Sequence, residues 1–189
     1  MNDQQLIVDV GAWAEKNFDY FNPWLGMVEE TGEIAHCLLK HKQGIRGFDS
    51  EDMFLSEYTD ALADVAIYAA HYAFLHPEVR PGFQLDPDTL KDAGTNLIIG
   101  LLLIHLADLE VGPDDDQDSD DIELLRTVLS CTATLAHQKG VDLREITYAV
   151  WDKVVSKRDW VESPCRGVTI TPVEMKDTLA APFRHLDPL

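Results

Sequence analysis

The 189-residue sequence is poor in cysteine and in basic residues. Its three cysteines, Cys37, Cys131 and Cys165, are far apart, and no CxxC motif occurs. This number and spacing exclude a disulfide framework and a cysteine-based zinc site, so we expect reduced thiols. Lysine and arginine number 15 against 34 acidic residues, for a formal net charge of -19. Because nucleic acids and anionic membranes attract cationic surfaces, this charge argues against non-specific binding to either.

Long apolar runs and glycine-rich phosphate loops are also missing. The longest apolar stretch, residues 96–109, is interrupted by His105 and Asp108 and is too short to span a bilayer. The first residues, MNDQQLIVDVGAW, lack the basic-then-apolar pattern of a signal peptide. Gly44 and Gly47 are not followed by the Lys-Ser/Thr pair of a P-loop. We therefore expect a cytoplasmic protein with no membrane partner.

What the sequence has in quantity is helical periodicity. Hydrophobic residues make up 46% and charged residues 26%, which is a globular composition. Apolar positions recur at helical spacing, whereas signals for β-strands are weak. The predicted helices cover about 3–19, 23–42, 51–75, 88–110, 120–139 and 141–160. We predict an all-α helical bundle of five or six helices, with a single domain over 1–160 and an irregular tail over 161–189.

Three carboxylates interrupt the apolar pattern of the second predicted helix. Within the stretch WLGMVEETGEIAHCLLK, Glu29, Glu30 and Glu33 stand among leucine, valine and isoleucine. At about 100° per residue, Glu30 and Glu33 project within about 60° of each other. Acidic pairs on a solvated helix face are common, so this cluster alone does not define a site.

The third predicted helix repeats the acidic pattern. Glu57, Asp60 and Asp64 are spaced by three and four residues, so they share one face. A short loop joins the two helices, and we expect them to be antiparallel neighbours. Two facing sets of carboxylates repel strongly unless a cation lies between them. Ligands that offer only oxygen favour a hard cation, Mg²⁺ or Mn²⁺, over zinc.

The two motifs together resemble a known family. EETGE followed by DALADVAIY is similar to the EExxE and ExxD motifs of the MazG-like all-α nucleotide pyrophosphohydrolases, and the resemblance extends to GVDLREITYAVWDKVVSKRDW. It implies a MazG-like fold and an Mg²⁺-dependent hydrolase that cleaves nucleoside triphosphates to the monophosphate and pyrophosphate, in nucleotide-pool house-cleaning. Residues 77–120 then form an insertion with an extra helix and an acidic loop.

The resemblance also assigns metal ligands. It implies that Glu30, Glu33 and Asp64 are the core ligands of the metal ion. The family's next glutamate falls on Ala61 in this sequence, and Asp60, one turn before Asp64, is the favoured replacement.

Other acidic residues keep alternative assignments. Glu57 and Asp60 form a literal ExxD one turn earlier, which leaves the alignment of the motif open. Glu57 and Glu29 are candidates to hold a second ion or a water molecule. Glu29 or Glu33 is the candidate catalytic residue that orients or deprotonates the attacking water.

Candidate substrate-binding residues lie outside the acidic clusters. Lys153, Lys157 and Arg158 stand near the end of the last predicted helix, where they could contact phosphate oxygens. Alternatively, they are ordinary cations favoured by the helix dipole. Trp24 is a candidate to stack on a nucleobase, with core packing as the alternative.

The remaining predictions concern how the chain assembles and whether it is catalytically active. Relatives in the family assemble as dimers or dimers of dimers, so we expect a homodimer or dimer of dimers. A second hypothesis is a catalytically silent module that binds metal or nucleotide for regulation, because Ala61 replaces a family ligand and the insertion is large. A third is an acidic helical interaction protein with no site.

Overall fold

The computed structural model describes residues 1–18, 22–45, 48, 50–90, 92–110, 118–153 and 155–157. The chain divides into two units, Met1–Arg158 and Asp159–Leu189, of which the second lies outside the described residues. The helices of the first unit are α1 (Asp3–Asn17), α2 (Pro23–Gln43), α3 (Glu51–Leu75), the 3₁₀-helix η1 (Pro77–Gly82), α4 (Thr95–Glu110), α5 (Asp118–His137), α6 (Leu143–Lys153) and the 3₁₀-helix η2 (Val155–Lys157). The described residues include no strand, which confirms the all-α prediction. None of the described helices combines the length and apolarity needed to cross a membrane.

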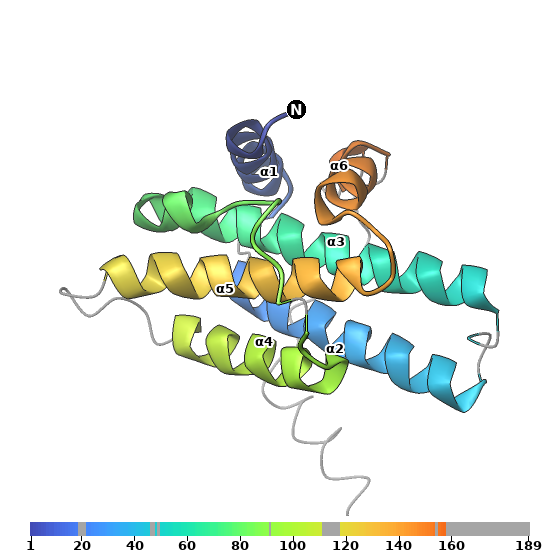
Figure 1. Cartoon of the computed structure of the whole chain (residues 1–189). Coiled ribbons are helices and arrows are strands. Elements are labelled where there is room, and N and C mark those ends of the chain that lie inside the picture. The colour runs from blue at the N-terminus through green and yellow to red at the C-terminus, as the bar shows by residue number, and fades with distance from the viewer. Residues whose placement is uncertain are drawn as a thin grey trace, which may run out of the picture. The chain divides into compact units, whose positions relative to one another are not determined.

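The helix α3 is the centre of the bundle. It packs against α1, α2, α5 and α6, and α2 is its most extensive neighbour. In Figure 1, α1 and α6 lie on one side of α3, while α2 and α4 lie on the other side. Alanine at six buried positions of α3 leaves room for neighbouring helices on several sides. These alanines are Ala61, Ala63, Ala66, Ala69, Ala70 and Ala73.

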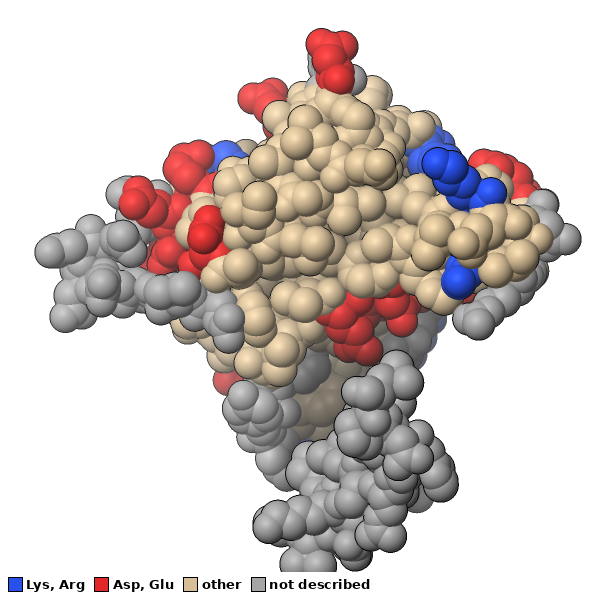
Figure 2. Space-filling view, turned by 90° about the horizontal axis from the view of Figure 1, so that it is seen from below, with Lys and Arg blue, Asp and Glu red and all other residues tan. Residues whose placement is uncertain are grey.

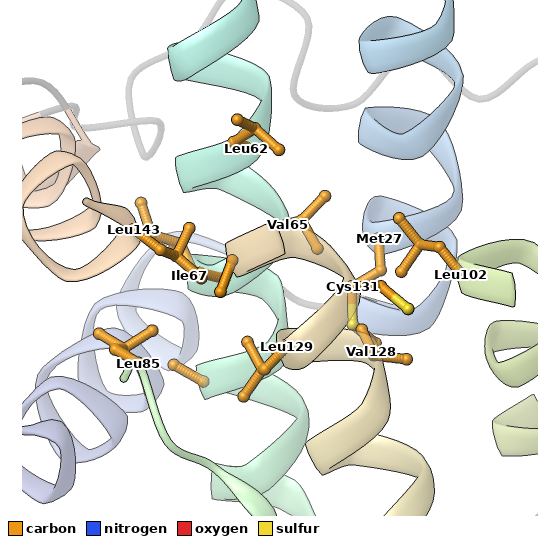
Figure 3. Packing of buried hydrophobic residues seen from close by; sticks show 14 of the residues in the cluster. Met27, Leu62, Val65, Ile67, Leu85, Leu102, Val128, Leu129, Cys131 and Leu143 are labelled. Atoms are coloured by element: carbon orange, nitrogen blue, oxygen red, sulfur yellow. The ribbon is translucent and has the colours of Figure 1, made fainter. Parts of the chain in front are cut away.

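The core draws apolar side chains from all six α-helices and from the segment after η1. Figure 3 shows Met27 of α2, Leu102 of α4 and Leu143 of α6 around residues of α3 and α5, together with Leu85 from the segment after η1. The thiols of Cys37 and Cys131 are free and buried in this core, as expected for reduced cysteines. Cys165 lies outside the described residues.

Local capping sets where the two carboxylate-bearing helices begin. The side chain of Asn22 accepts a hydrogen bond from the Leu25 amide (3.2 Å), and Pro23 occupies the first turn of α2. The hydroxyl of Ser50 accepts from the Met53 amide at the start of α3. Gly44 ends α2 at φ +63°, a left-handed conformation that favours glycine. These caps set where the acidic residues fall along each helix.

The fourth helix is shorter than predicted. Periodicity indicated a start near residue 88, but α4 begins at Thr95. The segment before it runs in irregular backbone because tertiary hydrogen bonds hold it there. The Leu90 amide donates to Thr134 Oγ1 (2.9 Å), and the side-chain amide of Gln138 donates to the Ala93 carbonyl (2.8 Å). The predicted acidic loop after α4 covers residues 111–121. Residues 111–117 lie outside the described residues, whereas 118–121 form the first turn of α5, which begins at Asp118.

The last helix is also shorter than predicted. The periodic pattern suggested one helix over 141–160, whereas α6 ends at Lys153 and is followed by η2. A 3₁₀ turn commonly tightens the end of an α-helix, where the backbone carbonyls have no further partners within the helix.

Candidate functional site

The two carboxylate-bearing helices approach closely at a glycine. A Cβ atom at Gly26 would lie 2.4 Å from Cδ1 of Tyr68, so the tyrosine ring occupies the space of a side chain. Glu30 stands one turn after Gly26, and Asp64 stands one turn before Tyr68. Because α2 and α3 run antiparallel, this register brings Glu30 and Asp64 to the same level.

Glu30 lies at the centre of the acidic residues from both helices. Its side chain is half-buried, and burial is the largest cause that raises its pKa. The charges of Asp64, Glu33, Glu29 and Asp60 follow in that order, and together these effects raise the pKa of Glu30 from 4.5 to about 8. Every one of these charges is negative. A cation bound among these carboxylates would reduce the repulsion between them.

Glu57 lies on α3, seven residues before Asp64. Burial raises the pKa of the Cys37 thiol to about 11, and the charges of Glu57 and Glu33 add to that effect. The thiol therefore stays protonated at neutral pH, which leaves carboxylates as the ligands on this face. Asp64 is half-buried, whereas the other acidic residues around Glu30 are exposed.

The donor chemistry of these residues fits a hard divalent cation. Mg²⁺ prefers carboxylate oxygens, keeps several waters and is often held by one or two carboxylates together with substrate phosphates. Among the described side chains, no three of His, Cys, Asp and Glu form a ready-made metal site. The exposed carboxylates can turn by staggered rotamers toward a shared ion. The residues therefore fit an open site better than a closed protein cage.

Ala61 marks the difference from the family motif. Its side chain is 2% exposed and belongs to the hydrophobic core, whereas Asp60 is exposed. Asp60 and Asp64, four residues apart, share one face of α3. The structure thus places Asp60, and not position 61, among the carboxylates near Glu30.

Trp24 is not brought to the carboxylates. Its indole Nε1 donates a hydrogen bond to the Leu106 carbonyl (2.6 Å), which ties α2 to α4. Trp24 also projects about 120° around α2 from Glu30. The indole therefore serves packing between α2 and α4 in this structure.

The predicted basic residues are only partly described. Lys153 and Lys157 are exposed, at the end of α6 and in η2, and neither forms an ion pair with a carboxylate that the structure describes. Arg158 lies outside the described residues. The helix that carries Lys153 packs on α3.

Two residues that shape the site were missed in the sequence. Gly26 and Tyr68 set the approach of α2 to α3, a role that the acidic motifs do not predict. The available signal was a glycine on the apolar side of a helix, four residues before Glu30.

Comparison of the chain with models of protein families, with curated proteins and with solved structures found no match.

Proposed function

We propose that this protein is an Mg²⁺-dependent nucleoside triphosphate pyrophosphohydrolase of the MazG-like type, acting on NTPs or dNTPs. The observation that supports it is the convergence of carboxylates from α2 and α3 around Glu30. A chain with a net charge of -19 repels a triphosphate unless a cation neutralises the binding surface. The acidic cluster supplies ligands for such a cation, which Mn²⁺ could replace.

Glu30 and the four carboxylates around it each have a role in this proposal. Glu30 and Asp64, both half-buried, hold the ion together with Glu33, and Asp60 takes the place left by Ala61. The bound ion would neutralise the phosphate chain and align it for in-line attack. Exposed Glu29 or Glu33 accepts a proton from the attacking water.

The remaining elements of the proposal concern substrate and assembly. Lys153, Lys157 and Arg158 contact the phosphate oxygens, where negative charge develops. Four of the carboxylates near the site are exposed, so the site is open to water on this chain. A second copy of the chain, in a homodimer or dimer of dimers, would enclose it. A role in cytoplasmic nucleotide-pool house-cleaning follows from this activity.

A substrate screen tests the proposal. Purified protein is incubated with common and damaged nucleoside triphosphates in Mg²⁺ or Mn²⁺, and monophosphate and pyrophosphate are measured separately. We expect equal amounts of both products, and a loss of at least about 100-fold in turnover for Glu33→Gln and for Asp64→Asn. Exposed Glu15→Gln on α1 is the matched control, and circular dichroism checks helix content. Full activity in the two site variants would remove these residues from the mechanism.

A second candidate function rests on Ala61. Because position 61 is alanine, the site lacks one carboxylate of the motif that the sequence resembles. A module that binds metal and nucleotide without turnover is consistent with that loss. Calorimetry that detects nucleotide binding in Mg²⁺, together with no product from any triphosphate, would favour this candidate.

A further inference from the structure

A hollow lies between α2 and α4, beyond the carboxylates toward the C-terminal end of α2. It has a volume of about 660 Å³, within the range of roughly 300–1,000 Å³ common for small-molecule sites. The described residues that line it are Ala35, Leu38, Leu39, His41 and Lys42 of α2 and Thr95, Asn96 and Ile99 of α4. None of the candidate metal ligands lines the hollow, and its α2 residues follow Glu30 by five to twelve positions along the helix. This hollow is therefore separate from the candidate metal site.

The walls of the hollow are apolar. Leu38 and Ile99 are half-buried beside it, and Leu39 is 50% exposed. Figure 2 views the side of the molecule on which α2 and α4 lie. Uncharged residues cover much of this face, with a patch of acidic residues at its lower middle and basic residues toward the right. An apolar ligand would remove these leucine and isoleucine surfaces from water, at about 25 cal/mol for each Å² buried.

One part of the hollow is polar and basic. Of the described residues that line it, none is acidic, although 34 of the 189 residues in the chain are Asp or Glu. Lys42 is exposed and forms no ion pair within the part of the chain that the structure describes. Thr95 and Asn96 add a hydroxyl and an amide at the start of α4. This polar part of the hollow therefore suits an anionic group of a ligand.

The described groups near Lys42 do not engage its ammonium group. His41 Nε2 lies 3.2 Å from Glu51 Oε2, and its Nδ1 lies 2.9 Å from the Phe48 carbonyl oxygen, so both ring nitrogens have partners. The amide of Gly44 donates to the His41 carbonyl (3.0 Å) at the end of α2. Because backbone amides already bond to carbonyls at the end of α2, the Lys42 side chain is not needed to cap them.

We propose that the hollow between α2 and α4 binds a small amphiphilic anion, with an apolar chain or ring and one carboxylate. The carboxylate meets Lys42 and the polar groups of Thr95 and Asn96, and the apolar part lies against Leu38 and Ile99. A cationic amphiphile lacks a partner here. The net charge of -19 repels a multiply charged anionic bilayer far more than a single carboxylate, so the proposed ligand is a free molecule.

Calorimetry with decanoate tests this proposal on the full chain. We expect one decanoate per chain, and displacement of the fluorescent anion anilinonaphthalene sulfonate by decanoate but not by decyltrimethylammonium. Lys42→Glu should weaken decanoate binding by about tenfold or more, as expected for loss of a charge-assisted contact. Lys40→Glu is the matched control because Lys40 stands in the same turn, outside the lining, and donates to Gln43 (3.4 Å). It should change the affinity by less than about twofold.

A second variant tests the hollow itself. Ala35→Trp fills the space and should abolish decanoate binding while triphosphate hydrolysis is retained, which separates this proposal from the proposed function. Equal binding of decanoate and decyltrimethylammonium would overturn it, as would an unchanged affinity in Lys42→Glu. Failure of the wild-type chain to bind decanoate would also overturn it. In that case, light scattering that shows a dimer dissociated by Leu39→Glu would identify a second copy as the occupant.

Discussion

The ring of Tyr68 lies where Gly26 has no side chain, since a Cβ atom at Gly26 would be 2.4 Å from both Cδ1 and Cε1 of the tyrosine. This contact sets how closely α2 approaches α3. It stands one helical turn from both Glu30 and Asp64, so it also controls the spacing of the two half-buried carboxylates. Packing and the candidate site are therefore linked through one glycine.

The first prediction concerns that glycine. Gly26→Ala forces the Tyr68 ring to move, and we expect a loss of about 1–3 kcal/mol in the free energy of unfolding, as for other overpacked sites. Gly32→Ala on the same helix is the matched control because no heavy atom lies within 4 Å of its Cβ position. It should be neutral or stabilise the protein by up to about 1 kcal/mol. Urea denaturation measures both, and equal effects would contradict the packing argument.

The starts of α2 and α3, and the faces that carry their acidic residues, were predictable from short sequence patterns. Pro23 and Ser50 indicated where α2 and α3 begin, and the helical spacing of the acidic residues placed each set on one face. Tertiary partners were not predictable. Trp24 bonds to a carbonyl 82 positions away, and the segment before α4 is held by Thr134 of α5. Such contacts depend on how helices meet, which periodicity within one helix does not encode.

The second prediction concerns repulsion at Glu30. Glu30→Gln removes a charge that burial and then four neighbouring carboxylates disfavour, while the side chain keeps its size. In EDTA at pH 8 we expect a higher melting temperature than in the wild type. In Mg²⁺ the variant should lose most of the rise in melting temperature that a filled site gives. Glu15→Gln, exposed on α1, should show neither change. A lower melting temperature in EDTA would argue against repulsion at this position.

The third prediction separates Asp60 from Ala61. Asp60→Asn should reduce metal-dependent turnover by at least about tenfold, because it removes a proposed ligand. Ala61→Glu in that background should not restore turnover, since position 61 is 2% exposed within the core. A buried, unpaired glutamate there should cost several kcal/mol, on the order of 3–5, in urea denaturation. Restored activity in the double variant would instead place position 61 in the site.

The fourth prediction is a pH dependence of stability caused by His71. This residue is 3% exposed, and burial lowers its pKa from 6.5 to about 4. Above pH 6.5 the imidazole is neutral in both the folded and unfolded chains, so it contributes no slope. Between pH 6.5 and about 4, only the unfolded chain takes up the proton, and stability falls as the pH falls. The slope is about 1.4 kcal/mol per pH unit, or about 2 kcal/mol between pH 6.5 and 5.

Substitution isolates this effect. His71→Leu has no titrating group, so its free energy of unfolding should fall less between pH 6.5 and 5 than that of the wild type. The comparison uses the slope and not the absolute stability, because the substitution also alters packing. His137→Gln, at an exposed position of α5, should keep the wild-type slope. Identical slopes in His71→Leu and the wild type would assign the acid sensitivity to other groups.

The fifth prediction concerns Asp3, which joins α1 to two distant segments. Its carboxylate accepts hydrogen bonds from Tyr148 Oη (2.8 Å), Arg144 Nη2 (3.1 Å) and the Leu85 amide (3.2 Å). Burial, followed by the hydrogen bond to Asp3, raises the pKa of Tyr148 to about 12. We expect Asp3→Ala to destabilise the fold by about 2 kcal/mol, because it leaves these donors without their acceptor. The Arg144 side chain is 42% exposed and can turn to water, which limits the cost.

A double-mutant cycle in urea denaturation measures the contact between Asp3 and Tyr148. Tyr148→Phe alone should cost about 1.5 kcal/mol, since it removes one hydrogen bond to a charged acceptor. In the Asp3→Ala background the same change should be close to neutral, because the acceptor is already gone. Asp9→Ala on the same helix is the control. Asp9 accepts only an exposed bond from Gln5 among the described hydrogen bonds, and its loss should cost less than about 0.5 kcal/mol. Additive effects of the Asp3 and Tyr148 substitutions would show that the two residues stabilise the fold independently.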